Sequence, residues 1–295
     1  MKLLLENWRR QCGEYDFDIL CENFDRGLIT EIELYETWDR QVMVEMQTLL
    51  DEGIMDIFKI GYEKGKVLVG KAKKTYDAAI AKVTEFYLKL CLQAWGLIQK
   101  GKVVLERIAA ILMKGVNFIK KFCNVHPILC KVIFALVVLF CITAVMAMMA
   151  TPAMAKITTG SEGEYVISDT GVLAIKGCLE HLGRHADPEG QQLTVDALEW
   201  LDKAHTATTS TNIHSVADEG ARVAQICYET MVQEAPAEEI RHLARLGKKV
   251  MVAANEYDAK LNAVEIRSIK WQSLSLSTDA ENVSRLHPKN FDFKK

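Results

Sequence analysis

An apolar stripe between residues 72 and 122 is the longest regular pattern in the chain. Apolar or small residues return there every three or four positions, which is the spacing of one face of an α-helix. The stripe predicts one long amphipathic helix, or two helices stacked end to end. Gly96, Gly101 and Gly115 interrupt it. Because glycine costs about 1 kcal/mol relative to alanine in an exposed helix interior, we expect bends or close contacts there.

An apolar run without such a stripe follows, at residues 132–150. About 20 apolar residues in a helix cross the hydrocarbon layer of a bilayer. The run therefore predicts a transmembrane segment over residues 132–155, and His126 and Pro127 mark the start of its helix. Seven Lys and Arg residues lie between positions 100 and 131, whereas only Lys156 and Lys176 follow up to position 176. By the positive-inside rule, the N-terminal half faces the cytoplasm and the C-terminal half lies across the membrane.

Shorter patterns divide the rest of the chain. Leu4, Leu5 and Trp8 share one arc of a short amphipathic leader that ends at Gly13. Beyond the span, helices are predicted over residues 194–204, 214–233 and 236–270, the last two as a hairpin. The predicted fold is an all-α, single-pass membrane protein with long amphipathic helices before the span and a helical-hairpin domain after it. Its segments are a leader (1–13), an acidic helical segment (14–58), a basic amphipathic region (59–131), the transmembrane helix (132–155), a soluble helical domain (156–272) and a polar tail (273–295).

Charge is segregated along the chain, although the net charge is only −3. Residues 1–58 carry 5 Lys or Arg against 14 Asp or Glu, while residues 59–131 carry 15 against 4. The basic region has two interpretations, a packed helix with a solvated face or a helix that lies on an anionic membrane. The basic region could also bind nucleic acid, but because it lies next to the predicted span, membrane phosphates are the simpler partner. The expected membrane-surface contacts are Lys71, Lys73, Lys74, Lys82, Lys120 and Lys121.

Candidate catalytic chemistry is sparse. The chain has no phosphate-binding loop, dinucleotide glycine pattern or nucleophile elbow. Its eight cysteines form no Cys-x-x-Cys pair, so we expect reduced, buried thiols. His181 and His185 have the spacing of two metal ligands on one helix face, but they lack a second ligand cluster and are interpreted as surface histidines. No enzymatic activity, cofactor or metal site is predicted.

A small-x-small pattern stands directly after the apolar run. Ala153 and Ala155 have the spacing of a signal-peptidase site behind a basic flank and an apolar core. The alternative is an alanine-rich helix that ends near Pro152.

The opening sequence MKLLLENWRR resembles the amphipathic leaders of virion and internal head proteins from large contractile-tailed phages, particularly marine and cyanobacterial ones. In that family such leaders look like capsid-targeting peptides, and the prohead protease cuts after Glu in a Leu/Ile-x-Glu context. Leu4-Leu5-Glu6 matches that context, which makes Glu6 the candidate cleavage position. The resemblance covers the leader and does not extend to the apolar run or the C-terminal region.

The apolar run predicts a membrane-anchored protein, and the resemblance of the leader implies a phage origin. We therefore expect a non-enzymatic, membrane-anchored phage virion or internal head protein that inserts into the host inner membrane. The expected partners are the lipid bilayer, phage head proteins and further copies of the chain through its helices, with no specific nucleic acid. Two alternatives stay open, a holin-like or other lysis-related membrane protein and a cellular membrane-anchored adaptor.

Overall fold

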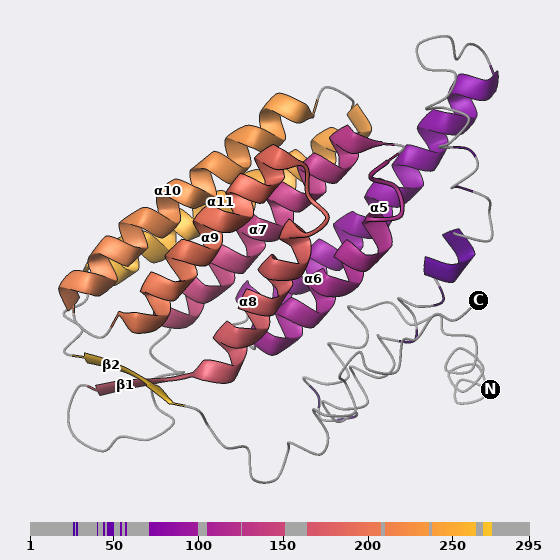
Figure 1. The fold of residues 1–295 in the computed structure, drawn as a ribbon. Coiled ribbons are helices and arrows are strands. Elements are labelled where there is room, and N and C mark those ends of the chain that lie inside the picture. The colour runs from indigo at the N-terminus through magenta and orange to yellow at the C-terminus, as the bar shows by residue number, and fades with distance from the viewer. Residues whose placement is uncertain are drawn as a thin grey trace.

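The computed structural model describes residues 71–99, 105–124, 126–150, 164–207, 210–235, 238–263 and 268–272, together with single positions and a short stretch between 26 and 57. Within these residues the fold is a helical bundle with one pair of short strands, as Figure 1 shows. The elements in chain order are α5 (Lys71–Gln99), α6 (Leu105–Ile119), α7 (Pro127–Ala150), β1 (Glu164–Ser168), α8 (Asp169–Gly183), α9 (Pro188–Thr206), α10 (Ser210–Glu234), α11 (Glu238–Ala263) and β2 (Ser268–Gln272).

The apolar run forms the central helix of the bundle. Helix α7 contacts α5, α6, α8, α9, α10 and α11, and every residue from 132 to 149 is buried. Figure 1 shows α7 running through the middle of the bundle. The predicted start at Pro127 is confirmed, because Pro suits the first helical position, where its missing N–H is not needed.

Helices α5 and α6 correct the prediction of one long helix or an end-to-end stack. Tyr87 of α5 lies against Gly115 of α6, and Phe86 packs on Phe118 with ring centroids 5.0 Å apart. As the residue number increases along α5, the residue number of the contacting partner on α6 decreases. The two helices are therefore antiparallel and form a hairpin. The amphipathic faces were predicted correctly, but the two helices pack on each other and on α7, and α5 also packs on α11 and α6 on α8.

Helix α8 runs parallel to α6, and contacting residues of the two helices are separated by a constant number of positions in the sequence. The Thr170 hydroxyl donates to Glu106 Oε1 at 2.6 Å, and His181 Nε2 lies 2.9 Å from Asn117 Oδ1. Both pairs are 64 residues apart in sequence. The two helices therefore end at the same level.

The last three helices form an antiparallel series. Trp200 Nε1 on α9 donates to the Val216 carbonyl on α10 at 2.8 Å, and Asn262 on α11 donates to Asp218 on α10 at 2.9 Å. The hairpin predicted after residue 214 is thus found in α10 and α11. The predicted extension of its second helix to Lys270 is wrong, because α11 ends at Ala263 and residues 268–272 form β2.

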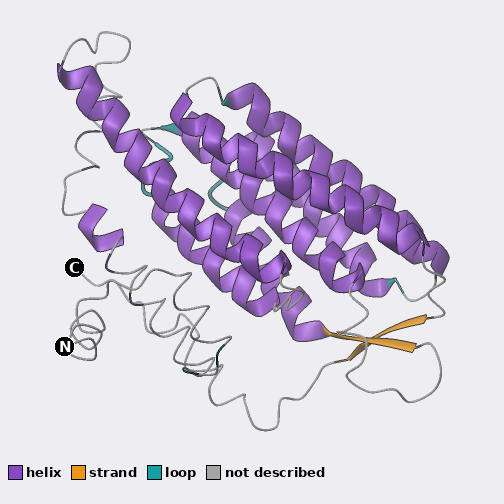
Figure 2. Cartoon of the chain, turned by 180° about the vertical axis from the view of Figure 1, so that it is seen from behind, coloured by secondary structure: helices purple, strands orange, loops and turns teal. Residues whose placement is uncertain are grey.

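Strands β1 and β2 were not predicted. They pair in parallel, with Tyr165 opposite Ile269 and Ile167 opposite Trp271. Figure 2 shows them at one end of the bundle. Five-residue strands leave too short a pattern to be recognised without their partner.

Candidate functional site

Helix α7 combines the composition of a membrane span with the surroundings of a protein core. Among the described helices it alone is long and apolar enough to cross a membrane, and its most apolar part is entirely buried by other helices. Its one buried polar side chain, Thr143, donates to the Leu139 carbonyl at 2.8 Å, so the hydroxyl is satisfied within the helix. The apolar surface of α7 needs no partner other than lipid or apolar side chains.

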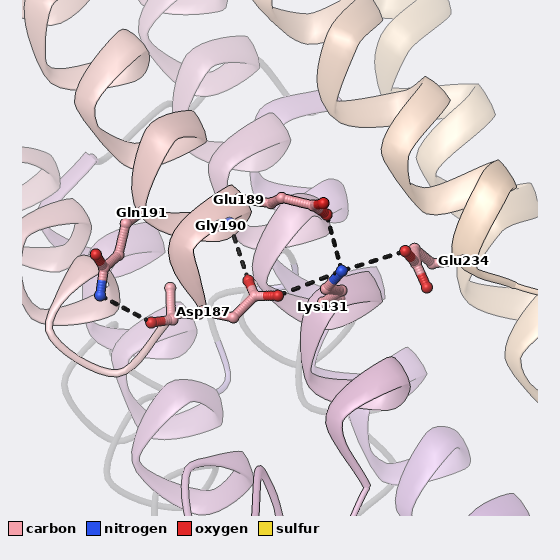
Figure 3. A network of polar contacts seen from close by, with 7 residues as sticks. Lys131, Asp187, Glu189, Gly190, Gln191 and Glu234 are labelled. Atoms are coloured by element: carbon pink, nitrogen blue, oxygen red, sulfur yellow. Dashed lines mark hydrogen bonds and ion pairs between the residues drawn. The ribbon is translucent and has the colours of Figure 1, made fainter.

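Three carboxylates surround Lys131, the single charged residue of α7 (Figure 3). Its Nζ lies 2.8 Å from Glu189 Oε2, 3.3 Å from Asp187 Oδ2 and 3.3 Å from Glu234 Oε1. The lysine side chain is 22% exposed and those of Asp187 and Glu234 are 35% and 30% exposed, so water only partly screens these two ion pairs. The side chain of Glu189 is 71% exposed, so its ion pair is screened more strongly. We call these four residues the Lys131 cluster.

The Lys131 cluster joins the start of α7 to the ends of two other helices. Asp187 is the N-cap of α9, where its Oδ1 accepts from the Gly190 N–H at 3.0 Å, and Glu189 lies in the first turn of that helix. Carboxylates are favourable at such an N-terminus, whereas Glu234 is the last residue of α10, where a negative charge opposes the helix dipole. The ammonium of Lys131 therefore stabilises Glu234 in this position.

His126 caps α7 at the same end. Its Nδ1 accepts from the Leu129 N–H at 3.1 Å, which satisfies one of the unpaired amides of the first turn. The ring stacks on Tyr76 of α5, with centroids 6.1 Å apart and planes 9° from parallel. Burial lowers the pKa of His126 from its usual 6.5, and the cap requires the neutral ring because a protonated Nδ1 cannot accept.

Basic side chains predicted to contact a membrane lie near this end of the bundle. The side chains of Lys74 and Lys82 are exposed on α5, and those of Lys120 and Lys121 follow directly after α6, Lys121 exposed and Lys120 half-buried. Because Tyr87 faces Gly115 in the antiparallel hairpin, Lys82 is level with Lys120.

Two further predicted contacts, Lys71 and Lys73, belong to the first turn of α5. Their side chains lie outside the described part of the structure.

His181 and His185 come together without forming a metal site. Their rings are 4.9 Å apart, but His181 Nε2 is used by Asn117 Oδ1, and His185 lies in the turn that follows α8 rather than on the helix. Burial lowers the pKa of both, with smaller contributions from Lys120 and Arg184. In the described residues no three His, Cys, Asp or Glu side chains are grouped to hold a metal ion.

Lys120 and Arg184, near these histidines, directly follow the ends of α6 and α8. The two helices are parallel and end at the same level, and a positive charge is favourable at such C-terminal ends.

Several predicted site residues fall outside the described residues. These are the leader positions Leu4, Leu5, Glu6 and Trp8 and the possible processing positions Ala153 and Ala155.

Sequence reasoning missed the Lys131 cluster. The available signal was a lone lysine beside a long uncharged run. Its partners, Glu189 and Glu234, are 58 and 103 residues away, beyond the reach of any local pattern. Comparison with known proteins found no matching family model, curated protein or solved structure.

Proposed function

We propose that this chain is a non-enzymatic membrane-inserting protein that stores its membrane-crossing helix, α7, in the core of a helical bundle. One observation carries the proposal: the most apolar part of a helix with the length and composition of a membrane span is buried inside the bundle. Buried helices of soluble bundles satisfy the same description, so a bundle without a membrane role is the second candidate.

The outer surface of the bundle supports storage over permanent embedding. On α11, Arg241, Arg245, Lys248, Lys249 and Glu256 are exposed, and such a surface is incompatible with lipid tails. The intact bundle therefore belongs in water or at the membrane surface. To enter a bilayer, α7 must separate from its neighbours and exchange one apolar environment for another.

The basic residues near the start of α7 suit the first encounter with an anionic membrane. Each Lys near such a surface contributes about 1 kcal/mol, and the attraction decays within a Debye length. Docking through Lys82 and Lys121 brings the N-terminal end of α7 close to the head groups. The proposed location is the host inner membrane, with the N-terminal half on the cytoplasmic side.

The phage setting rests on the leader alone. We propose that the leader carries the protein into the prohead as a virion or internal head protein and is removed after Glu6. Mass spectrometry of purified particles tests this directly: a peptide that begins at Asn7 supports both packaging and cleavage. Absence of the chain from particles, with abundant chain in infected cells, favours the holin-like alternative, and a chain made in uninfected cells favours a cellular adaptor.

Insertion is tested with the full chain and vesicles that carry a photoactivatable group at the end of a lipid acyl chain. After illumination, mass spectrometry identifies the cross-linked peptides. We expect cross-links at residues 132–149 with phosphatidylglycerol-rich vesicles and few with phosphatidylcholine. If cross-links form only on the surface helices with both lipids, the second candidate, a helical bundle without a membrane role, is favoured. Release of an encapsulated dye would favour the holin-like function.

Two substitutions with opposite expected effects separate insertion from general unfolding. Leu201→Ala removes a buried side chain of α9 and should cost about 2–5 kcal/mol of bundle stability without altering α7. It should increase cross-linking of α7. Val138→Arg also destabilises the bundle but places a charge near mid-bilayer, at a cost of about 2.5–3.5 kcal/mol. It should decrease cross-linking. Equal changes in both variants would contradict insertion of α7.

A further inference from the structure

The position of Lys131 in α7 matches the boundary of a bilayer. Nineteen residues without a charge follow it, from 132 to the end of the helix at Ala150. At 1.5 Å per residue they extend roughly 28 Å, close to the thickness of the hydrocarbon layer. When these residues fill that layer, Lys131 reaches the level of the lipid phosphates.

In the bundle the same ammonium group is held by oxygen anions of the protein. The cluster has one positive charge and three negative charges, drawn from α7, α9 and α10. Two of the carboxylates lie on the α9 N-terminus and one on the α10 C-terminus, so the ion pairs hold α7 to both helices. Removal of α7 takes the ammonium of Lys131 away from all three carboxylates, so the lysine needs other oxygen anions if it is to stay paired.

We propose that Lys131 and its three carboxylates form an electrostatic latch, which opens when phosphates of anionic lipid head groups replace Asp187, Glu189 and Glu234 as the partners of the lysine. This inference rests on the proposed insertion of α7 and specifies what controls it. The lysine is never transferred bare into the hydrocarbon, because it passes from one set of oxygen anions to another. The latch thereby couples release of α7 to the presence of an anionic surface.

A matched pair of variants tests the latch. Glu234→Gln removes one carboxylate of the cluster, while Glu219→Gln removes a carboxylate outside the cluster, which pairs with Lys203 at 2.7 Å between α9 and α10. The two glutamates are similarly exposed, at 30% and 23%. With phosphatidylglycerol vesicles we expect Glu234→Gln to speed the cross-linking of α7 about tenfold, which corresponds to about 1.4 kcal/mol. Glu219→Gln should leave the rate within about twofold of wild type.

Substitution of the lysine tests the exchange of partners. Lys131→Gln should reduce the dependence of α7 cross-linking on the phosphatidylglycerol fraction, and Lys131→Arg should preserve it. Inorganic phosphate at matched ionic strength, with phosphatidylcholine vesicles, distinguishes a free anion from a lipid head group. We expect it to produce no cross-linking of α7, and release by phosphate alone would contradict the role of the membrane surface.

The outcomes separate the latch from the underlying function. Equal acceleration by Glu234→Gln and Glu219→Gln, or unchanged lipid dependence in Lys131→Gln, would overturn the latch while insertion stands. If wild type and all variants show no cross-links in α7, insertion itself fails and the latch fails with it. Amide hydrogen exchange without lipid tests independently whether the ion pairs hold α7. Glu234→Gln, but not Glu219→Gln, should speed exchange in the first turns of α7.

Discussion

The phenol of Tyr87 on α5 donates a hydrogen bond to the backbone carbonyl oxygen of Gly115 on α6. The contact is possible because Gly115 has no side chain: a Cβ there would lie 3.1–3.3 Å from atoms of the Tyr87 ring and hydroxyl. Burial raises the pKa of Tyr87 well above its usual 10.0, so the phenol stays protonated and remains a donor. Gly115 therefore leaves the space in which the Tyr87 phenol reaches the backbone of α6.

Changes to this pair should be coupled. Tyr87→Phe should lower the free energy of unfolding by about 1 kcal/mol through loss of the hydrogen bond. Gly115→Ala should cost about 1–3 kcal/mol because its methyl group presses on the ring. The double variant should lose less than the sum, since removal of the hydroxyl relieves part of the clash. Urea unfolding followed by circular dichroism measures all three, and strict additivity would argue against the contact.

His126 should make stability depend on pH. Its pKa is lowered in the folded protein by burial, so the unfolded chain binds the proton more readily. The contribution is complete above about pH 6.5 and is lost as the pH falls below that value toward the folded pKa. We expect the urea midpoint to drop between pH 7.5 and pH 5.

Asparagine at position 126 isolates this effect, because it also caps helices but does not titrate. His126→Asn should flatten the pH dependence of the urea midpoint relative to wild type. His181 and His185, whose pKa values are also lowered, contribute in the same direction in every variant. Identical slopes in wild type and His126→Asn would exclude His126 as a pH-sensitive cap.

Two glycines should respond in opposite ways to alanine. A Cβ at Gly220 would lie 2.9 Å from three atoms of the Trp200 indole, so Gly220→Ala should destabilise by about 1–3 kcal/mol. Gly177 is exposed on α8 with nothing within 4 Å of the added Cβ, so Gly177→Ala should stabilise by about 0.5–1 kcal/mol. Thermal unfolding of the two variants tests the packing of α9 on α10. A neutral Gly220→Ala would contradict it.

Thr143→Val should be nearly neutral in the bundle. The hydroxyl bonds only to the Leu139 carbonyl within α7, so its replacement by a methyl group leaves no unmatched polar group elsewhere. We expect a change in unfolding free energy of less than about 1 kcal/mol, measured by urea titration. A large loss would mean that the hydroxyl has a partner outside the helix.

Local patterns were sufficient for much of the helical structure. The three-to-four spacing identified the buried faces of α5 and α6, helices were predicted where α9, α10 and α11 lie, and Pro127 marked the start of α7. The direction of α6 relative to α5 could not be read this way, because an apolar stripe shows that a face is buried but not what covers it. Gly115 was expected at a bend or a close contact. The structure shows a close contact, because Tyr87 lies against Gly115.

The sequence by itself determined that residues 132–150 form a long apolar helix, since no charge interrupts them and every face is apolar. Only the tertiary structure decided what surrounds that helix in the folded chain. Lipid tails and apolar side chains satisfy an apolar surface about equally, so composition cannot separate a membrane span from a core helix. The partners of Lys131 were equally out of reach, because folding brings together a lysine and carboxylates that are separated by 58 and 103 residues.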